Sequence, residues 1–81
     1  MVTHPYSIYI WQPGRGVHGK GFWFEPIQAY TLEYGIYVAQ LIHKDTHSVI
    51  KVVRFGVNQA CFPDEATVEK IEAFIAKQSE I

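Results

Sequence analysis

Alternation of large side chains near the start of the chain predicts the first strand. Residues 6–11, YSIYIW, place aromatic and aliphatic side chains on both sides of an extended backbone, a pattern typical of a strand covered on both faces. Residues 22–30, FWFEPIQAY, regain strand character, and Pro26 favours an edge position or a bulge there. Because a glycine-rich run separates the two segments, we expect a hairpin with a long loop.

Residues 31–45 fit two patterns. As a helix, the segment has Thr31 as its N-cap and a polar stripe opposite an apolar one. The polar stripe holds Glu33, Tyr37, Gln40 and Lys44, and the apolar stripe holds Ile36, Val38, Ala39, Leu41 and Ile42. As a strand, the segment alternates almost as well, and Gly35 costs a helix about 1 kcal/mol relative to Ala. We favour the helix because the polar stripe is continuous and no turn signal precedes Lys44.

The second half of the chain predicts two more strands. Residues 48–55, SVIKVVRF, are rich in β-branched side chains, and we expect Lys51 and Arg54 at or near solvent. Residues 56–58 then turn the chain into a shorter strand over residues 59–62.

The C-terminal segment predicts an amphipathic helix. Asp64 is its expected N-cap, and Glu65 lies in the first turn, where an acid is favoured. The apolar face holds Val68, Ile71, Phe74 and Ile75, and the face expected to be solvated holds Glu65, Glu69, Lys70 and Glu72.

These elements predict an α+β fold in the order ββαββα. The simplest arrangement is a small four-stranded antiparallel sheet with the helices on one face. If residues 31–45 form a strand, the alternative is a strongly curved sheet or barrel with one C-terminal helix. At 81 residues the chain has room for one core, so we expect a single domain spanning residues 1–81.

Composition narrows the expected environment. The lone cysteine, Cys61, cannot form an intrachain disulfide, which favours a reducing, cytoplasmic location. The apolar stretch near the N-terminus is too short for a signal peptide, and no apolar run approaches the roughly 20 residues that span a bilayer. We therefore expect a soluble protein without membrane contact.

Charge is unevenly distributed along the chain. Residues 1–56 carry five Lys and Arg against three Asp and Glu, whereas residues 57–81 carry two against five, and the net charge is −1. A general nucleic-acid binder has a much larger basic excess. The charge therefore supports a local anion contact and no more.

The most unusual segment is the glycine-rich run QPGRGVHGKG, residues 12–21. It matches the G-x-G-x-x-G pattern and most of the phosphate-loop pattern, but Gly21 stands where the phosphate loop needs Ser or Thr. Both patterns also need a helix next, and the following FWFEP favours a strand. A weaker possibility remains, because glycine-rich backbone with Arg15, His18 and Lys20 offers several donors to an anion.

Candidate metal and thiol chemistry is weak. His43 and His47 are four residues apart, yet two ligands do not make a site, and the simpler interpretation is that they cap carbonyls at a helix end. Cys61 between Ala60 and Phe62 is typical of a buried, inert thiol. We therefore expect no catalytic residues, no metal and no cofactor, and an enzyme is unexpected.

Aromatic side chains carry the functional hypothesis. Five tyrosines and two tryptophans exceed what so small a core can bury, so some must be exposed, as at protein interfaces. We expect a non-enzymatic protein-interaction or regulatory module that binds a partner protein of unknown identity, and homodimerisation is also open. The expected contact residues are Trp11, Arg15, His18, Lys20, Phe22 and Trp23. The alternative is single-stranded nucleic-acid or phosphate-ligand binding by Arg15, Lys20, Lys51 and Arg54 beside the tryptophans.

Overall fold

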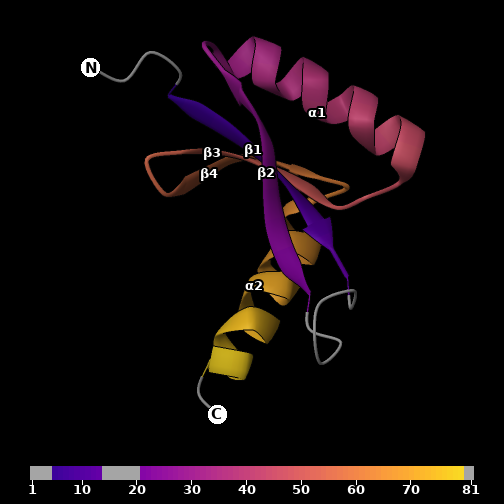
Figure 1. Cartoon of the computed structure of the whole chain (residues 1–81), viewed down its shortest axis with the longest axis vertical. Helices are drawn as coiled ribbons and strands as arrows, with labels where there is room; N and C mark the ends of the chain where they lie inside the picture. The colour runs from indigo at the N-terminus through magenta and orange to yellow at the C-terminus, as the bar shows by residue number, and fades with distance from the viewer. Residues whose placement is uncertain (1–4, 14–20, 80–81) are drawn as a thin grey trace.

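The computed structural model describes residues 5–13 and 21–79, and the predicted contact residues Arg15, His18 and Lys20 lie outside these ranges. The elements in chain order are β1 (Tyr6–Gln12), β2 (Phe22–Ala29), α1 (Leu32–Thr46), β3 (Ile50–Arg54), β4 (Val57–Phe62) and α2 (Glu65–Ser79). The four strands form one sheet in the order β2-β1-β3-β4, and every neighbouring pair is antiparallel (Figure 1). The prediction of an α+β fold on an antiparallel sheet is confirmed.

Strand β2 lies at one edge of this sheet, as Pro26 predicted. Ile8 pairs with Ile27 whereas Ile10 pairs with Phe24, so two residues of β2 lie opposite one residue of β1. This bulge contains Pro26, which has no N–H to donate to a strand ladder.

The middle segment is the helix α1, so the curved-sheet alternative is wrong. The backbone N–H of Tyr34 donates to Thr31 Oγ1 over 3.1 Å, which confirms Thr31 as the N-cap. At the other end His47 is left-handed, with φ 59°, and its N–H donates to the carbonyl of His43. A Cβ at Gly35 would lie 3.2 Å from Val52 Cγ1, so this glycine permits close approach of α1 to β3.

The two helices pack on opposite faces of the sheet. The core under α1 contains Ile8, Ile50 and Val52, all fully buried, together with Ala39 of the helix. Lys51, the neighbour of Val52, faces the other side of β3 and bonds Glu72 of α2. Figure 1 accordingly shows the helices on either side of the strands. The prediction that both lie on one face is wrong, because β1 and β3 carry large side chains on both faces and each face needs a cover.

Helix α2 begins as predicted. The backbone N–H of Thr67 donates to Asp64 Oδ1 over 2.8 Å, and this bond lowers the pKa of the Asp64 carboxyl. Val68 is fully buried beneath the helix. Glu72, however, is only partly solvated: its side chain is 38% exposed, and its carboxylate reaches Lys51 and Asn58 of the sheet. In the described part of the chain, no helix is long and apolar enough to cross a membrane.

The β3–β4 turn is tighter than the predicted turn at residues 56–58. Phe55 and Gly56 both have positive φ, at 49° and 80°, and β4 begins directly after them. Two positive φ values in a two-residue loop match the twist of the flanking strands.

Candidate functional site

A pair of tryptophans lies at the loop end of the β1–β2 hairpin. Trp11 and Trp23 are opposite each other in the register, with ring centroids 5.4 Å apart and planes at 62°. This edge-to-face geometry is favourable for aromatic rings. A Cβ at Gly21 would overlap the Trp11 ring and come within 2.9 Å of the Gln12 carbonyl oxygen, so only glycine fits here. The last glycine of the loop segment is therefore needed for packing.

Lys51 joins this aromatic pair to α2. Its ammonium lies 4.4 Å from the centre of the Trp23 ring and 5.4 Å from that of Tyr9. It is also 3.2 Å from Glu72 Oε1, which accepts a second hydrogen bond from Asn58 Nδ2 over 2.9 Å. The Lys51 side chain is 15% exposed and borders an open cavity, so it lies near solvent but is more covered than a free surface lysine. Its long stem crosses an aromatic surface.

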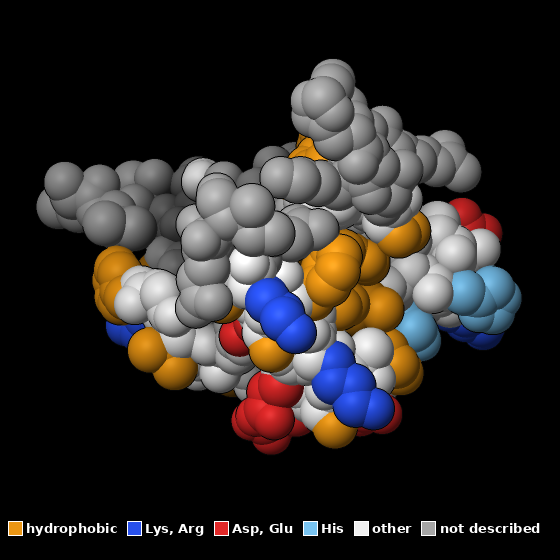
Figure 2. All heavy atoms as spheres, turned by 90° about the horizontal axis from the view of Figure 1, so that it is seen from below, with side chains coloured by type: hydrophobic (Ala, Val, Ile, Leu, Met, Phe, Trp, Pro, Cys, Tyr) orange, Lys and Arg blue, Asp and Glu red, His pale blue; other side chains and the backbone are white. Residues whose placement is uncertain are grey.

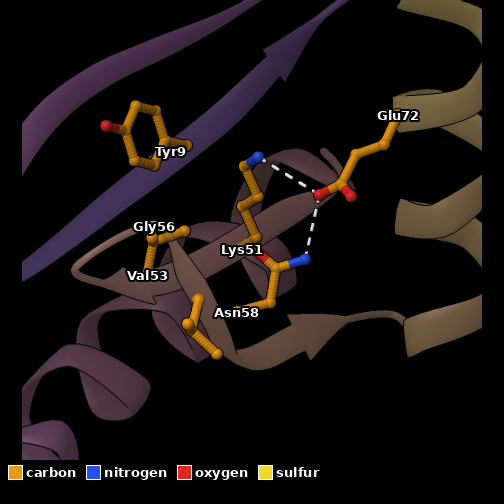
Figure 3. Close-up of a pocket in the computed structure, with 7 residues that line it drawn as sticks. Tyr9, Lys51, Val53, Gly56, Asn58 and Glu72 are labelled. Carbon is orange, nitrogen blue, oxygen red and sulfur yellow. Dashed lines mark hydrogen bonds and ion pairs between the residues drawn. The ribbon is translucent and has the colours of Figure 1, made fainter. Parts of the chain in front are cut away.

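The Glu72 carboxylate is stabilised in its charged form. The hydrogen bond from Asn58 and the ion pair with Lys51 lower its pKa, against an opposing effect of burial. In Figure 3 Lys51 and Asn58 both point toward Glu72, which extends from α2 toward the β3–β4 hairpin. The three side chains therefore tie α2 to the sheet through one carboxylate oxygen.

A cavity of about 510 Å³ opens beside these side chains (Figure 3). Its lining consists of Tyr9, Lys51, Val53, Gly56, Val57, Asn58 and Glu72. The cation and the carboxylate in its wall neutralise each other, so the wall offers no excess charge to an ionic ligand.

Cys61 lies on the same face as Lys51, its partner in the β3–β4 register. Burial raises the pKa of its thiol, and the negative charges of Glu65 and Glu72 raise it further. A thiol in this environment stays protonated at neutral pH, whereas a nucleophilic cysteine needs the opposite shift.

The residues of the metal hypothesis are not brought together. The ring of His43 lies on the α1 face, where Nδ1 is 2.7 Å from the Ser48 carbonyl oxygen. His47 caps the helix through its backbone, and Cys61 lies on the opposite face of the sheet. Within residues 5–13 and 21–79, no group of three or more His, Cys, Asp or Glu side chains is placed to hold a metal ion.

The structure separates the other predicted site residues. Phe22 is 48% exposed at the start of β2, and Phe24, which was not predicted, is 45% exposed. Arg54 points away from Lys51, because residues three apart on a strand face opposite sides. Its guanidinium lies 5.5 Å from the Tyr6 ring and 5.3 Å from the Phe55 ring.

Sequence reasoning missed Asn58 and Glu72. A signal for Glu72 exists, since it falls four residues after Val68, within the apolar stripe of α2. An acid at that position predicts a buried cationic partner. Asn58 carries no comparable signal.

Comparison with known proteins gives no relative: no family model matches the chain, and neither a curated protein nor a solved structure matches it with significance.

Proposed function

We propose that this chain is a non-enzymatic protein-interaction module that binds a partner protein through the β1–β2 hairpin. The observation that carries the proposal is the exposure of Phe22 and Phe24, at 48% and 45%, on the edge strand β2. Exposed aromatic side chains that lie together are enriched at protein interfaces. Figure 2 views the molecule from below, the side toward which the β1–β2 hairpin points in Figure 1, and hydrophobic side chains gather there beside Lys and Arg.

The hairpin is held in place before any partner arrives. Trp11 and Trp23 pack edge to face, Gly21 fits against the Trp11 ring, and the Lys51 ammonium lies over Trp23. A surface that is already ordered loses little conformational entropy on binding, which favours affinity. These contacts support the hairpin as a contact surface.

The backbone of β2 offers a second means of recognition. Among the described strands, β2 has a neighbour on one side alone, β1. An extended segment of a partner can add to such an edge through main-chain hydrogen bonds. The bulge at Pro26 interrupts that ladder, so the usable part of the edge is the segment that carries Phe22 and Phe24.

The non-enzymatic part of the proposal rests on the groups that could do chemistry. The raised pKa of Cys61 keeps its thiol protonated, and Lys51 and Glu72 neutralise each other. Neither arrangement supplies an activated nucleophile or an unpaired general base.

Site-specific photo-crosslinking tests the proposal. A photo-crosslinking phenylalanine analogue at position 22 should join the protein to a partner in cells, and the product is identified by mass spectrometry. The same analogue at Ala73, exposed on α2, is the matched control. The double substitution Phe22→Ser with Phe24→Ser should abolish capture by a probe at Pro13 while leaving the circular dichroism spectrum unchanged. Equal products from positions 22 and 73 would contradict the proposal.

Nucleic-acid binding is the alternative, and the two of its four cations that lie in the described part of the chain do not support it. Of Lys51 and Arg54, Lys51 alone lies beside the tryptophans, and its ammonium is already paired with Glu72. A single-stranded oligonucleotide added at low salt should therefore leave tryptophan fluorescence unchanged. Quenching that weakens steeply with salt would favour the alternative.

A further inference from the structure

A second group of exposed side chains lies at the end of the sheet away from the β1–β2 loop. Tyr6 and Arg54 are partners in the register of β1 and β3, and the β3–β4 turn follows directly at Phe55 and Gly56. Figure 1 shows this turn on the side where β1 begins. Phe55 and Val57 are 70% and 62% exposed. We call Tyr6, Arg54, Phe55 and Val57 the turn cluster.

The backbone at Phe55 is unfavourable for the residue that it carries. Its φ of 49° is left-handed, a conformation that Asn and Gly adopt readily and bulky residues rarely do. Exposure alone would not single this position out, because Leu41 is also 50% exposed although it was predicted on the apolar side of α1, a prediction that is wrong. Leu41, however, has ordinary helical backbone. Phe55 combines exposure with strain, which favours a role for its ring outside folding.

The Phe55 ring helps to position the guanidinium of Arg54. Arg54 Cζ lies 5.3 Å from the centre of the Phe55 ring and 5.5 Å from that of the Tyr6 ring. Arg54 Nη1 also donates to the Tyr6 hydroxyl over 3.4 Å, which is long for a hydrogen bond. Contacts with two rings restrict this exposed side chain, so less conformational entropy is lost when it binds. Most of its five N–H donors remain available in one plane.

No acid neutralises this guanidinium in the described part of the chain. None of the described carboxylates lies within ion-pair distance of Arg54, including that of Glu33 in the first turn of α1, the helix on the same face of the sheet. Lys51, by contrast, lies on the opposite face and is paired with Glu72. The Tyr6 hydroxyl accepts from Arg54 and keeps its own proton to donate. The turn cluster therefore offers one positive charge and several donors.

We propose that the turn cluster binds a carboxylate joined to an apolar group. A carboxylate accepts two parallel hydrogen bonds from a guanidinium, and the Tyr6 hydroxyl can donate a third. One cation matches the single charge of a carboxylate, whereas a phosphate monoester carries nearly two negative charges at pH 7. Phe55 and Val57 supply the apolar part of the contact. Two sources share this chemistry: the C-terminus of a peptide, and an acidic side chain beside an apolar residue.

NMR titration of the full chain with short peptides tests the proposal. The probes are acetyl-Gly-Leu with a free C-terminal carboxylate, acetyl-Asp-Leu-amide with a side-chain carboxylate, and the neutral acetyl-Asn-Leu-amide. A charged probe should shift the amide signals of residues 54–57 with a dissociation constant of roughly 1–10 mM, because one exposed ion pair is weak. The charged probe that binds more tightly identifies the source. Equal binding of the neutral probe, or tighter binding of phenyl phosphate, overturns the proposal.

Substitutions at Arg54 separate its shape from its charge. Arg54→Lys keeps the positive charge but loses the two parallel donors and should weaken binding several-fold, and Arg54→Gln should abolish it. Lys44→Gln removes an exposed charge at the end of α1, and this matched control should bind as the wild type does. Circular dichroism checks that each variant is folded. Wild-type affinity in either Arg54 variant overturns the proposal.

Phe55→Asn should move stability and binding in opposite directions. Asn is favoured at this position of the turn, so the urea midpoint of unfolding should rise. Loss of the ring should weaken binding of the charged probes several-fold, since the guanidinium is less restricted and the apolar contact is smaller. A variant that binds as tightly as the wild type, or that is less stable, overturns the role of Phe55.

This proposal and the proposed function fail separately, because they use opposite ends of the sheet. The Arg54→Gln variant should still give the crosslink at position 22. The Phe22→Ser with Phe24→Ser variant should still bind the charged probes.

Discussion

The face of the sheet under α1 and the face under α2 use alternate residues of the same strands, yet they are built differently. Under α1 the strands contribute Ile8, Ile50 and Val52, all fully buried. Under α2 the neighbouring position of β3 is Lys51, which is held by Glu72 and by aromatic rings. Helix α1 contacts all four strands, whereas α2 contacts mainly β4.

This difference indicates that the α1 face stabilises the fold, whereas the α2 face is less constrained by stability. Burial of an aliphatic side chain stabilises a fold by about 1.5–3 kcal/mol, whereas one hydrogen bond has a net contribution of about 0.5–1.5 kcal/mol. The α1 face therefore provides most of the stability. The α2 face tolerates a charged cluster and an open cavity, and it also carries the Trp11 and Trp23 pair at the loop end of the hairpin.

The largest effect is expected from truncation on the α1 face. Ile8→Ala should lower the free energy of unfolding by about 2–5 kcal/mol, because the cavity it leaves is surrounded by packed side chains that cannot collapse into it. Urea unfolding followed by circular dichroism measures the loss. Val57→Ala is the control, since Val57 is 62% exposed and should cost less than about 0.5 kcal/mol.

Val68→Ala tests the α2 face in the same way. Val68 is fully buried, but its helix contacts less of the sheet, so we expect a smaller loss of about 1–3 kcal/mol. Hydrogen exchange should show faster exchange along α2 than along α1, because α2 opens locally. A loss equal to that of Ile8→Ala, with uniform exchange, would mean that the two faces form one core.

The elements of the fold were largely predictable because their signals are local. Thr31 and Asp64 mark the starts of the two helices by capping, and Pro26 marks the edge strand and its bulge. No local signal determines which side of the sheet each helix covers. A strand with large side chains on both faces gives no preference for either, so the placement of both helices on one face was wrong. Gly35 also could not be explained from local sequence, because what requires a glycine there is the close contact with Val52, which is distant in the chain.

Glu72→Gln probes the polar cluster of the α2 face. The change removes the charge that pairs with Lys51, and at pH 7 we expect a loss of about 1 kcal/mol in the free energy of unfolding. Hydrogen bonds from Asn58 and Lys51 hold the pKa of Glu72 below its ordinary value of 4.5. The ionised carboxylate therefore contributes stability above pH 4.5, and this contribution is lost as the pH falls through the lowered pKa.

Unfolding in urea at several pH values between 7 and 3 measures this dependence. The difference between wild type and Glu72→Gln should be largest at neutral pH and should close as the pH falls. Glu69→Gln on the exposed side of α2 is the matched control and should follow the wild type. A difference that stays constant down to pH 3 would show that shape, and not charge, is responsible.

The candidate site was predictable in part. The tryptophans flanking the glycine loop were expected to act together, and Trp11 and Trp23 do form a pair. The link from Lys51 to Glu72 spans 21 residues and depends on how α2 lies against the sheet, which no local pattern specifies. Glu72 was predicted on a solvated face because three other charged residues of α2 are near it in sequence. Its position four residues after Val68, within the apolar stripe of α2, is the better indicator of where it lies.

The smallest effect concerns reactivity and leaves the fold unchanged. Burial, together with Glu65 and Glu72, raises the pKa of Cys61 above its ordinary value of 9.0, so little thiolate is present at pH 8. Reaction with an aromatic disulfide reagent should be slower in the native protein than in urea, by on the order of several-fold. Glu65→Gln removes one repelling charge and should speed the native reaction, whereas Glu33→Gln, on α1, should not. Equal rates in the native protein and in urea would show that the α2 face does not shield this thiol. The α2 face would then be more open, relative to the packed α1 face, than the structure indicates.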